Sequence, residues 1–183
     1  ALEVLKGRHE RAAALCREME MSCAQLRDAD ELDWINIGLT ADDMATLGML
    51  LPKWLPRLHT LYLGVNGFGD AGIQALCEGM GRGAAPSLTF LSLPYNKFGP
   101  AGAEALAAAL RRGAMPKLEM LGLDNNPIGN QGMAALAAPL RNRPALTWIN
   151  LVKCDIGDNS VASLVDNLGK DDFKALACLY LSQ

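Results

Sequence analysis

The feature that most limits how this chain can fold is an order of residues that returns every 28 to 30 positions. The stretches "LHTLYLGVNGFGDAGIQALCEGM", "LTFLSLPYNKFGPAGAEALAAAL" and "LEMLGLDNNPIGNQGMAALAAPL" begin at Leu58, Leu88 and Leu118. Further copies begin at Leu146 and Leu176, and a shorter one begins at Leu32. A period of this length indicates structural units that stack on one another, because one such unit is too small to bury its own apolar side.

The first half of each copy has the pattern of a short strand. Leu121 and Leu123 flank Gly122, and this alternation places both leucines on one face of an extended backbone. Gly129 and Gly132 follow, where a backbone without Cβ can bend sharply or approach a neighbour closely. The pattern therefore predicts a strand followed by a turn.

The second half of each copy has the spacing of an amphipathic helix, as in Ile73, Leu76, Cys77 and Met80. Units of strand, turn and helix that stack side by side form one parallel sheet. Helices are wider, at about 10 Å, than the strand spacing of about 4.8 Å, so the stack should curve. The predicted fold class is an α/β solenoid, a curved horseshoe segment with a parallel sheet on the concave face and helices on the convex face.

An asparagine follows the strand in three copies, at Asn66, Asn96 and Asn126. A carboxamide has donors and an acceptor, so it can satisfy backbone groups of neighbouring turns. These residues are predicted to form a structural ladder along the stack, with Cys154 and Thr40 at the same position of the outer copies. Neither of those two side chains can make all the bonds of an amide, so their turns should be looser.

The order L-x-x-L-x-L-x-x-N-x-[IF]-G-x-x-G-x-x-x-L, with its cysteine variant at Cys154, resembles the ribonuclease-inhibitor-like leucine-rich repeat. The resemblance implies about five repeats over residues 31–183, the last of them truncated. It also implies a binding scaffold, a role that the family fills in inhibiting enzymes, sensing ligands and activating small GTPases. The copy at Leu32 departs from the pattern, because it lacks the glycine segment and starts 26 residues before the next copy.

Residues 1–30 contain no repeat. Their apolar residues fall on one side of a helix amid arginine and glutamate, which predicts an amphipathic helical cap for the first repeat. The alternative is a coiled-coil stem. The residues of the stripe are Leu5, Ala12, Leu15, Cys16, Met19, Cys23 and Leu26.

The outward-pointing strand positions indicate where a partner would bind. They are Trp34 and Asn36, Thr60 and Tyr62, Phe90 and Ser92, Met120 and Gly122, Trp148 and Asn150, and Cys178 and Tyr180. With Tyr95, just past its strand, six of the ten aromatic residues map to this face, and aromatic anchors contribute much of the energy of protein interfaces. The predicted partner-binding residues are Trp34, Tyr62, Phe90, Tyr95, Met120, Trp148 and Tyr180. The alternative is that the rings only pack on one another and stabilise the sheet.

Basic residues gather near the predicted helix C-termini, where they complement the helix dipole. They are Arg82, Arg111, Arg112, Arg141 and Arg143. A basic edge that grips nucleic acid is the rival explanation. With a sequence pI of about 5.4 and no aromatics among the arginines, we expect no nucleic-acid partner.

The sequence predicts neither catalysis nor a cofactor or metal. Only two histidines occur, His9 and His59, and "GVNGFGDAG" lacks the G-K-[ST] ending of a phosphate loop. The predicted function is a non-catalytic scaffold that binds another protein. The alternatives are a structural subunit of a larger assembly and a leucine-rich-repeat GTPase-activating protein.

The cysteines and the hydropathy of the sequence indicate where in the cell the protein is located. The five cysteines form no C-x-x-C pair, and no apolar run of membrane-spanning length occurs. These features predict an intracellular, most simply cytoplasmic, protein without membrane insertion. The initial alanine and the incomplete last copy suggest part of a larger polypeptide or complex.

Overall fold

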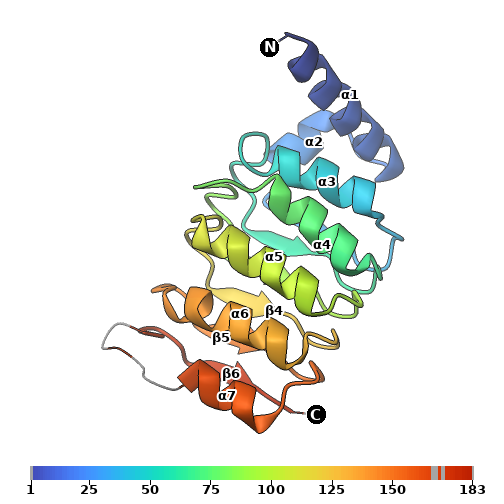
Figure 1. Ribbon diagram of the computed structural model, residues 1–183. Coiled ribbons are helices and arrows are strands. Elements are labelled where there is room, and N and C mark those ends of the chain that lie inside the picture. Colours follow the sequence, from blue (N-terminus) through green and yellow to red (C-terminus); the bar gives the residue numbers. More distant parts are fainter. Residues whose placement is uncertain (1, 166–168, 170–171, 183) are drawn as a thin grey trace.

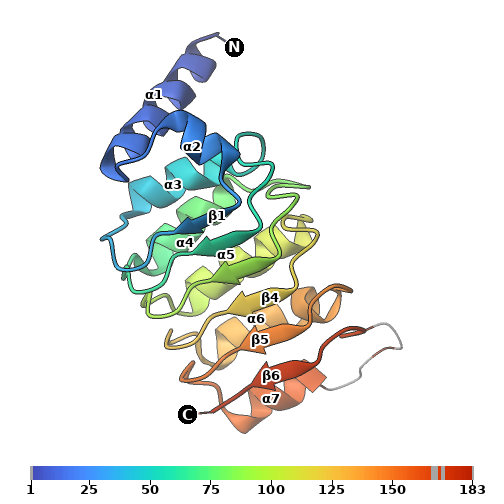
Figure 2. The ribbon, with the colours of Figure 1, turned by 180° about the vertical axis from the view of Figure 1, so that it is seen from behind.

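A six-stranded parallel sheet runs through the molecule, and its strands follow one another in chain order from β1 to β6. The computed structural model describes residues 2–165, 169 and 172–182. The strands form one layer and the helices that follow them form the other, with α1 at one end of the stack and α7 at the opposite end (Figures 1 and 2). This is the predicted α/β solenoid, and its sheet is open.

After two consecutive helices at the N-terminus, three-residue strands alternate with helices. The strands are β1 (Glu31–Asp33), β2 (Thr60–Tyr62), β3 (Phe90–Ser92), β4 (Met120–Gly122), β5 (Trp148–Asn150) and β6 (Cys178–Tyr180). The helices are α1 (Leu2–Glu18), α2 (Cys23–Asp28), α3 (Ala41–Leu50), α4 (Gly69–Glu78), α5 (Pro100–Arg111), α6 (Gly129–Arg141) and α7 (Asp158–Val165).

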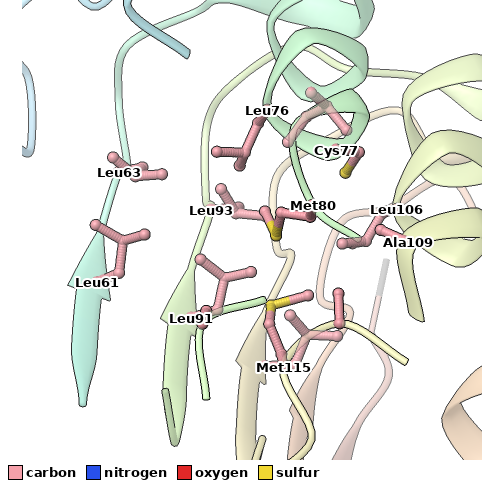
Figure 3. Close-up of a cluster of buried hydrophobic side chains, with 14 of the residues drawn as sticks. Leu61, Leu63, Leu76, Cys77, Met80, Leu91, Leu93, Leu106, Ala109 and Met115 are labelled. Carbon is pink, nitrogen blue, oxygen red and sulfur yellow. The ribbon is translucent and has the colours of Figure 1, made fainter. Parts of the chain in front are cut away.

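The core lies between the sheet and the helices. Leu61, Leu91 and Leu121 occupy the middle of successive strands, pair in register, and are completely buried. Figure 3 shows Leu61 and Leu91, with the leucines that follow them, pointing toward the apolar side of α4. Because each strand's inward side chains pack on helices of its own and the neighbouring repeat, the repeats cannot separate without exposing this core.

The two glycines of the repeat at Leu118 have different tasks. Gly129 has a φ of +65°, a conformation that L side chains seldom adopt, and it starts α6. Gly132 lies on the first turn of that helix, where a Cβ would come within 2.7 Å of the Ile128 side chain and 2.8 Å of the Ala103 side chain. The first glycine thus permits the bend, and the second permits close contact between adjacent helices.

The N-terminal segment forms two helices, α1 and α2, whereas the apolar stripe in residues 1–30 indicated one. The chain leaves α1 after Glu18, passes Glu20 with a φ of +51°, and starts α2 with a capping box. The hydroxyl of Ser22 accepts from the Gln25 N–H, and the Gln25 side chain accepts from the Ser22 N–H. This reciprocal cap satisfies donors that a continuous helix would bond internally.

The described apolar residues of these helices pack onto the first repeat. Ala12, Leu15, Cys16 and Leu26 are buried in the common core, and α1 contacts α3. The side chains of Leu5 and His9 lie outside the described residues. The two helices therefore cover the end of the repeat stack.

The first repeat is aligned differently from the prediction. Leu32 pairs with Leu61 and Asp33 pairs with Tyr62, so Leu32 is a mid-strand leucine and not the counterpart of Leu58. The three-residue shift moves Ile35 and Ile37 out of the strand, and both are exposed. The pairing is decided by backbone hydrogen bonds, such as that from the Trp34 N–H to the Tyr62 carbonyl.

Candidate functional site

The side of the sheet that faces away from the helices is called the sheet face below. From β2 to β6 its residues are Thr60, Tyr62, Phe90, Ser92, Met120, Gly122, Trp148, Asn150, Cys178 and Tyr180. Those of β2, β3 and β5 are half-buried, whereas the residue between them on each strand is buried. The alternation of the sequence thus places these five pairs of residues on one surface.

Four aromatic rings form a continuous series across this surface. The centroids of Tyr62 and Phe90 are 5.3 Å apart, those of Phe90 and Trp148 are 6.1 Å apart, and those of Trp148 and Tyr180 are 5.9 Å apart. The first two contacts are edge-to-face, an arrangement that aromatic rings favour. These four residues are called the aromatic row below.

Gly122 permits the contact between Phe90 and Trp148, which lie on strands that are not neighbours. Strand β4 runs between them, but Gly122 has no side chain there, and a Cβ at this position would lie 3.8 Å from the Trp148 ring. The indole therefore lies above the glycine. Sequence reasoning assigned Gly122 to this face without recognising that its missing side chain lets the rings meet.

Tyr95 lies beside the row, on the turn after β3, and is 52% exposed. Its φ is +56°, and Val65, at the same position of the preceding repeat, has a φ of +61°. Backbone bonds from the Val65 N–H to the Pro94 carbonyl and from the Tyr95 N–H to the Asp124 carbonyl hold these turns in place. Both side chains are exposed, so the turns extend the apolar surface beyond the strands.

A small polar cluster borders the row near β5. The Asp124 carboxylate accepts a hydrogen bond of 2.9 Å from the Asn150 amide and one of 2.8 Å from the Asn125 amide. These bonds fix the carboxylate at the edge of the sheet face. An anionic acceptor thus lies at the edge of the sheet face near β5.

The asparagines after the strands form a ladder beneath these turns. Oδ1 of Asn96 accepts from the N–H groups of Asn66 and Gly67, both at 3.0 Å, and its amide nitrogen donates to the carbonyls of Leu63 and Leu93. Asn96 and Asn126 are completely buried. The ladder thus joins each turn to the next and supports the edge of the sheet face.

Cys154 stands at the end of this column and makes fewer bonds. Its thiol lies 3.3 Å from the Leu123 carbonyl and 3.7 Å from the Val152 carbonyl. Burial raises the pKa of this thiol to about 11, so it is neutral at physiological pH. A thiol donates only weakly, so this turn is tied less firmly than those held by asparagine.

Comparison with known families identifies the repeat. A family model described as "Leucine Rich repeat" matches residues 56–77, 84–107 and 114–137, and each matched segment begins before a strand and ends within the following helix. This chain is a leucine-rich-repeat protein. The matches do not distinguish subtypes, so the ribonuclease-inhibitor-like assignment stays a prediction.

A relative that contains leucine-rich repeats is "NACHT, LRR and PYD domains-containing protein 5" of Bos taurus. It is 42% identical over 66 residues, which are 36% of this chain and 6% of the relative. The match therefore concerns a small part of a much larger protein.

The leucine-rich-repeat structure corrects two residue assignments. Trp34 is 5% exposed, because the shifted register places it beside Leu63 in the core, so it is not on the sheet face where the sequence placed it. Thr40 is not in the asparagine column either, because it caps α3 by accepting from the Asp43 N–H. Oδ1 of Asn66, which follows β2, accepts directly from the N–H groups of residues 37–39, which follow β1 in the first repeat.

Two of the clustered arginines are bound to the preceding repeat. Arg112 donates to the carbonyls of Cys77 and Met80, at 2.7 and 3.3 Å, and the buried Arg143 donates to those of Leu110 and Met115. These carbonyls lie at or beyond the ends of helices, where they lack intrahelical donors. The structural explanation of the basic residues thus holds for this pair, and the bonds join successive leucine-rich repeats.

Leucine-rich repeats are typically non-catalytic interaction domains. In the part of the chain that the structure describes, no group of three His, Cys, Asp or Glu side chains could hold a metal ion. Among the same described residues, no helix is long and apolar enough to cross a membrane.

His59 forms a hydrogen bond to the Asp30 carboxylate at the N-terminal edge of the sheet.

Proposed function

We propose that this leucine-rich-repeat protein is a non-catalytic module that binds a partner protein through the aromatic row, with Tyr95 and Met120 beside it. The observation that carries the proposal is the unbroken series of rings from Tyr62 to Tyr180 on a surface that the helices leave open. Large rings that stay accessible supply much of the binding energy at protein interfaces.

The ring contacts favour binding and do not compete with it. Each ring is held by its neighbours, so little side-chain entropy remains to be lost when a partner covers them. The predicted alternative, in which the rings stabilise the sheet, therefore describes the same contacts in the unbound protein. Tyr180, at the end of the row, is still 48% exposed.

The test uses a block that retains all four aromatic residues and covers the row. Gly122 has a negative φ, and a Cβ there would make only ordinary van der Waals contacts with Ser92 and Trp148, so a Gly122→Arg side chain can project onto the row without backbone strain. Glu104→Arg on the exposed side of α5 is the matched control. Both variants and the unchanged chain are used to capture proteins from the source cell, with bound proteins identified by mass spectrometry.

We expect a protein that the unchanged chain and Glu104→Arg retain and Gly122→Arg loses. Far-UV circular dichroism and the thermal midpoint of each variant establish that both stay folded. Capture of the same protein by all three would place the binding surface elsewhere and refute the proposal.

We also propose an intracellular site of action within a larger polypeptide or complex. All five cysteines are free thiols, which suits a reducing compartment. The name of the bovine relative gives repeats alongside NACHT and PYD domains, which is a precedent for repeats inside a longer chain. Mass spectrometry of the endogenous protein, giving its size and thiol state, tests both statements, and an oxidised disulfide form would contradict the first.

A further inference from the structure

A groove separate from the aromatic row opens at the N-terminal end of the sheet, with a volume of about 460 Å³. One wall is residues 18–21, the end of α1 and the start of the segment that joins it to α2, and the other is strand β1 with Trp34 and Ile37. This is called the acidic groove below. It has no counterpart in the sequence prediction, because the break between α1 and α2 creates one of its walls.

The floor of the acidic groove is apolar and fixed. Trp34 is almost fully buried, and its backbone N–H and carbonyl bond to the Tyr62 carbonyl and the Asn66 amide. Met19 and Met21 are half-buried beside it, whereas Ile37 is 46% exposed. An exposed isoleucine next to two methionines offers a site for the aliphatic part of a ligand.

The rim is negatively charged. Glu18, Glu20, Glu31 and Asp33 are exposed, and the described lining contains no lysine or arginine. A fifth carboxylate, that of Asp43, raises the pKa of Glu18 through a hydrogen bond and repulsion, and this effect exceeds the opposite effect of Arg17. Unbalanced like charge around an apolar floor favours a cationic ligand.

We propose that the acidic groove binds a short basic segment of a partner protein, in which a lysine or arginine adjoins an aliphatic residue. The aliphatic side chain packs on Met21 and Ile37, and the cation lies among the carboxylates of Glu20 and Glu31. Long basic side chains suit this arrangement because their stems are apolar and their ends are charged. The proposal does not depend on the aromatic row.

The test is a titration of ¹⁵N-labelled protein, followed by two-dimensional NMR. The probe is acetyl-Gly-Leu-Lys-Arg-Leu-Gly-amide, and the control peptide has Glu-Glu in place of Lys-Arg. We expect saturable shifts at the amides of Met21, Glu31 and Ile37 with a Kd of about 1 mM, which is typical of a few weak contacts. The shifts should weaken at high salt, because exposed charges are screened.

Two double variants separate groove charge from total charge. Glu20→Gln with Glu31→Gln should raise the Kd about fivefold or more, as expected when two exposed charge pairs are lost. Glu78→Gln with Glu104→Gln removes the same charge from exposed positions of α4 and α5 and should leave the Kd unchanged. Equal weakening by both doubles would mean nonspecific attraction and would overturn the proposal.

Three other results would also refute it. The first is the absence of saturable groove shifts, and the second is equal binding of the Glu-Glu peptide. The third is a set of groove shifts that depends on protein concentration without peptide, since a second copy would then be the occupant. Shifts confined to the sheet face would refute the acidic groove while supporting the aromatic row as a binding surface.

Discussion

The backbone N–H of Asn96 donates a 2.8 Å hydrogen bond to Oδ1 of Asn126, which occupies the same position in the next repeat. Asn66 stands in the same relation to Asn96, at 3.0 Å. Both acceptor side chains are completely buried. The edge of the sheet face is therefore held by polar bonds that water cannot replace.

Truncation of Asn96 to alanine should lower the free energy of unfolding by about 3 kcal/mol or more. The change leaves the N–H groups of Asn66 and Gly67 without their acceptor and removes one of the two amide donors from each of the carbonyls of Leu63 and Leu93. Urea unfolding followed by circular dichroism measures the loss. Gln74→Ala on exposed α4 is the control and should change stability little; equal losses would contradict the importance of the ladder.

Replacement of Cys154 by asparagine should raise the free energy of unfolding by about 1 kcal/mol, the usual net value of one additional hydrogen bond. The amide can accept from a backbone N–H of the preceding turn, as Asn126 accepts from Asn96, and can donate more strongly than the thiol. Urea midpoints provide the comparison. Cys154→Ser tests whether polarity alone is enough, and a gain as large as that of asparagine would exclude a specific role for the amide.

Leu121→Ala should lower the free energy of unfolding by about 2 to 5 kcal/mol, because it opens a cavity at a fully buried strand position. Trp148→Ala should cost at most about 2 kcal/mol, since the ring is half-buried and loses its two aromatic contacts. Thermal unfolding of both variants provides the measurement. A cost for Trp148→Ala as large as that for Leu121→Ala would mean that the row is part of the core.

Arg143→Ala should destabilise the fold by about 2 kcal/mol, because the carbonyls of Leu110 and Met115 lose a charged donor in a buried place. Arg82→Ala, at an exposed position after α4, is the matched control with an expected change near zero. Chemical unfolding of the two variants measures both free energies of unfolding. Similar costs would show that general charge, and not the two bonds, stabilises this end of α5.

Stability should fall as the pH rises from about 9 toward 12. Burial raises the pKa of Cys77 from its ordinary value of 9.0 to about 12, so the folded state keeps its proton while the unfolded state loses it. Below pH 9 the Cys77 thiol is protonated in both the folded and the unfolded state, and its contribution to stability is complete. Above pH 9 the thiol of the unfolded state loses its proton, which favours unfolding. Urea midpoints at about pH 8 and pH 10.5 measure the effect.

Cys77→Ala isolates that contribution, because tyrosines and lysines also titrate at high pH. Its stability should depend less steeply on pH in this range than that of the unchanged protein. Identical slopes would contradict the assignment. The exposed Cys178 should react with a thiol reagent at pH 8 in the folded state, whereas Cys77 should not.

Much of the repeat could be predicted from the sequence, because its determinants are local. The alternation around Leu121 sets which side chains face the core, and Gly129 permits the turn that only a residue tolerant of positive φ adopts easily. The position of Asn96 after its strand is enough to expect a ladder, since adjacent turns repeat the same geometry. These features were predicted because each follows from a short pattern that several copies share.

Tertiary structure decided the features that depend on contacts between elements. Trp34 is in the core because strand pairing sets the register of the first repeat, and its own sequence allowed another alignment. The break between α1 and α2 depends on packing against α3 and on the Ser22 cap, and it opens the acidic groove. The meeting of Phe90 and Trp148 above Gly122 requires three strands in register, so the period alone determined the fold but not the surface that the fold presents.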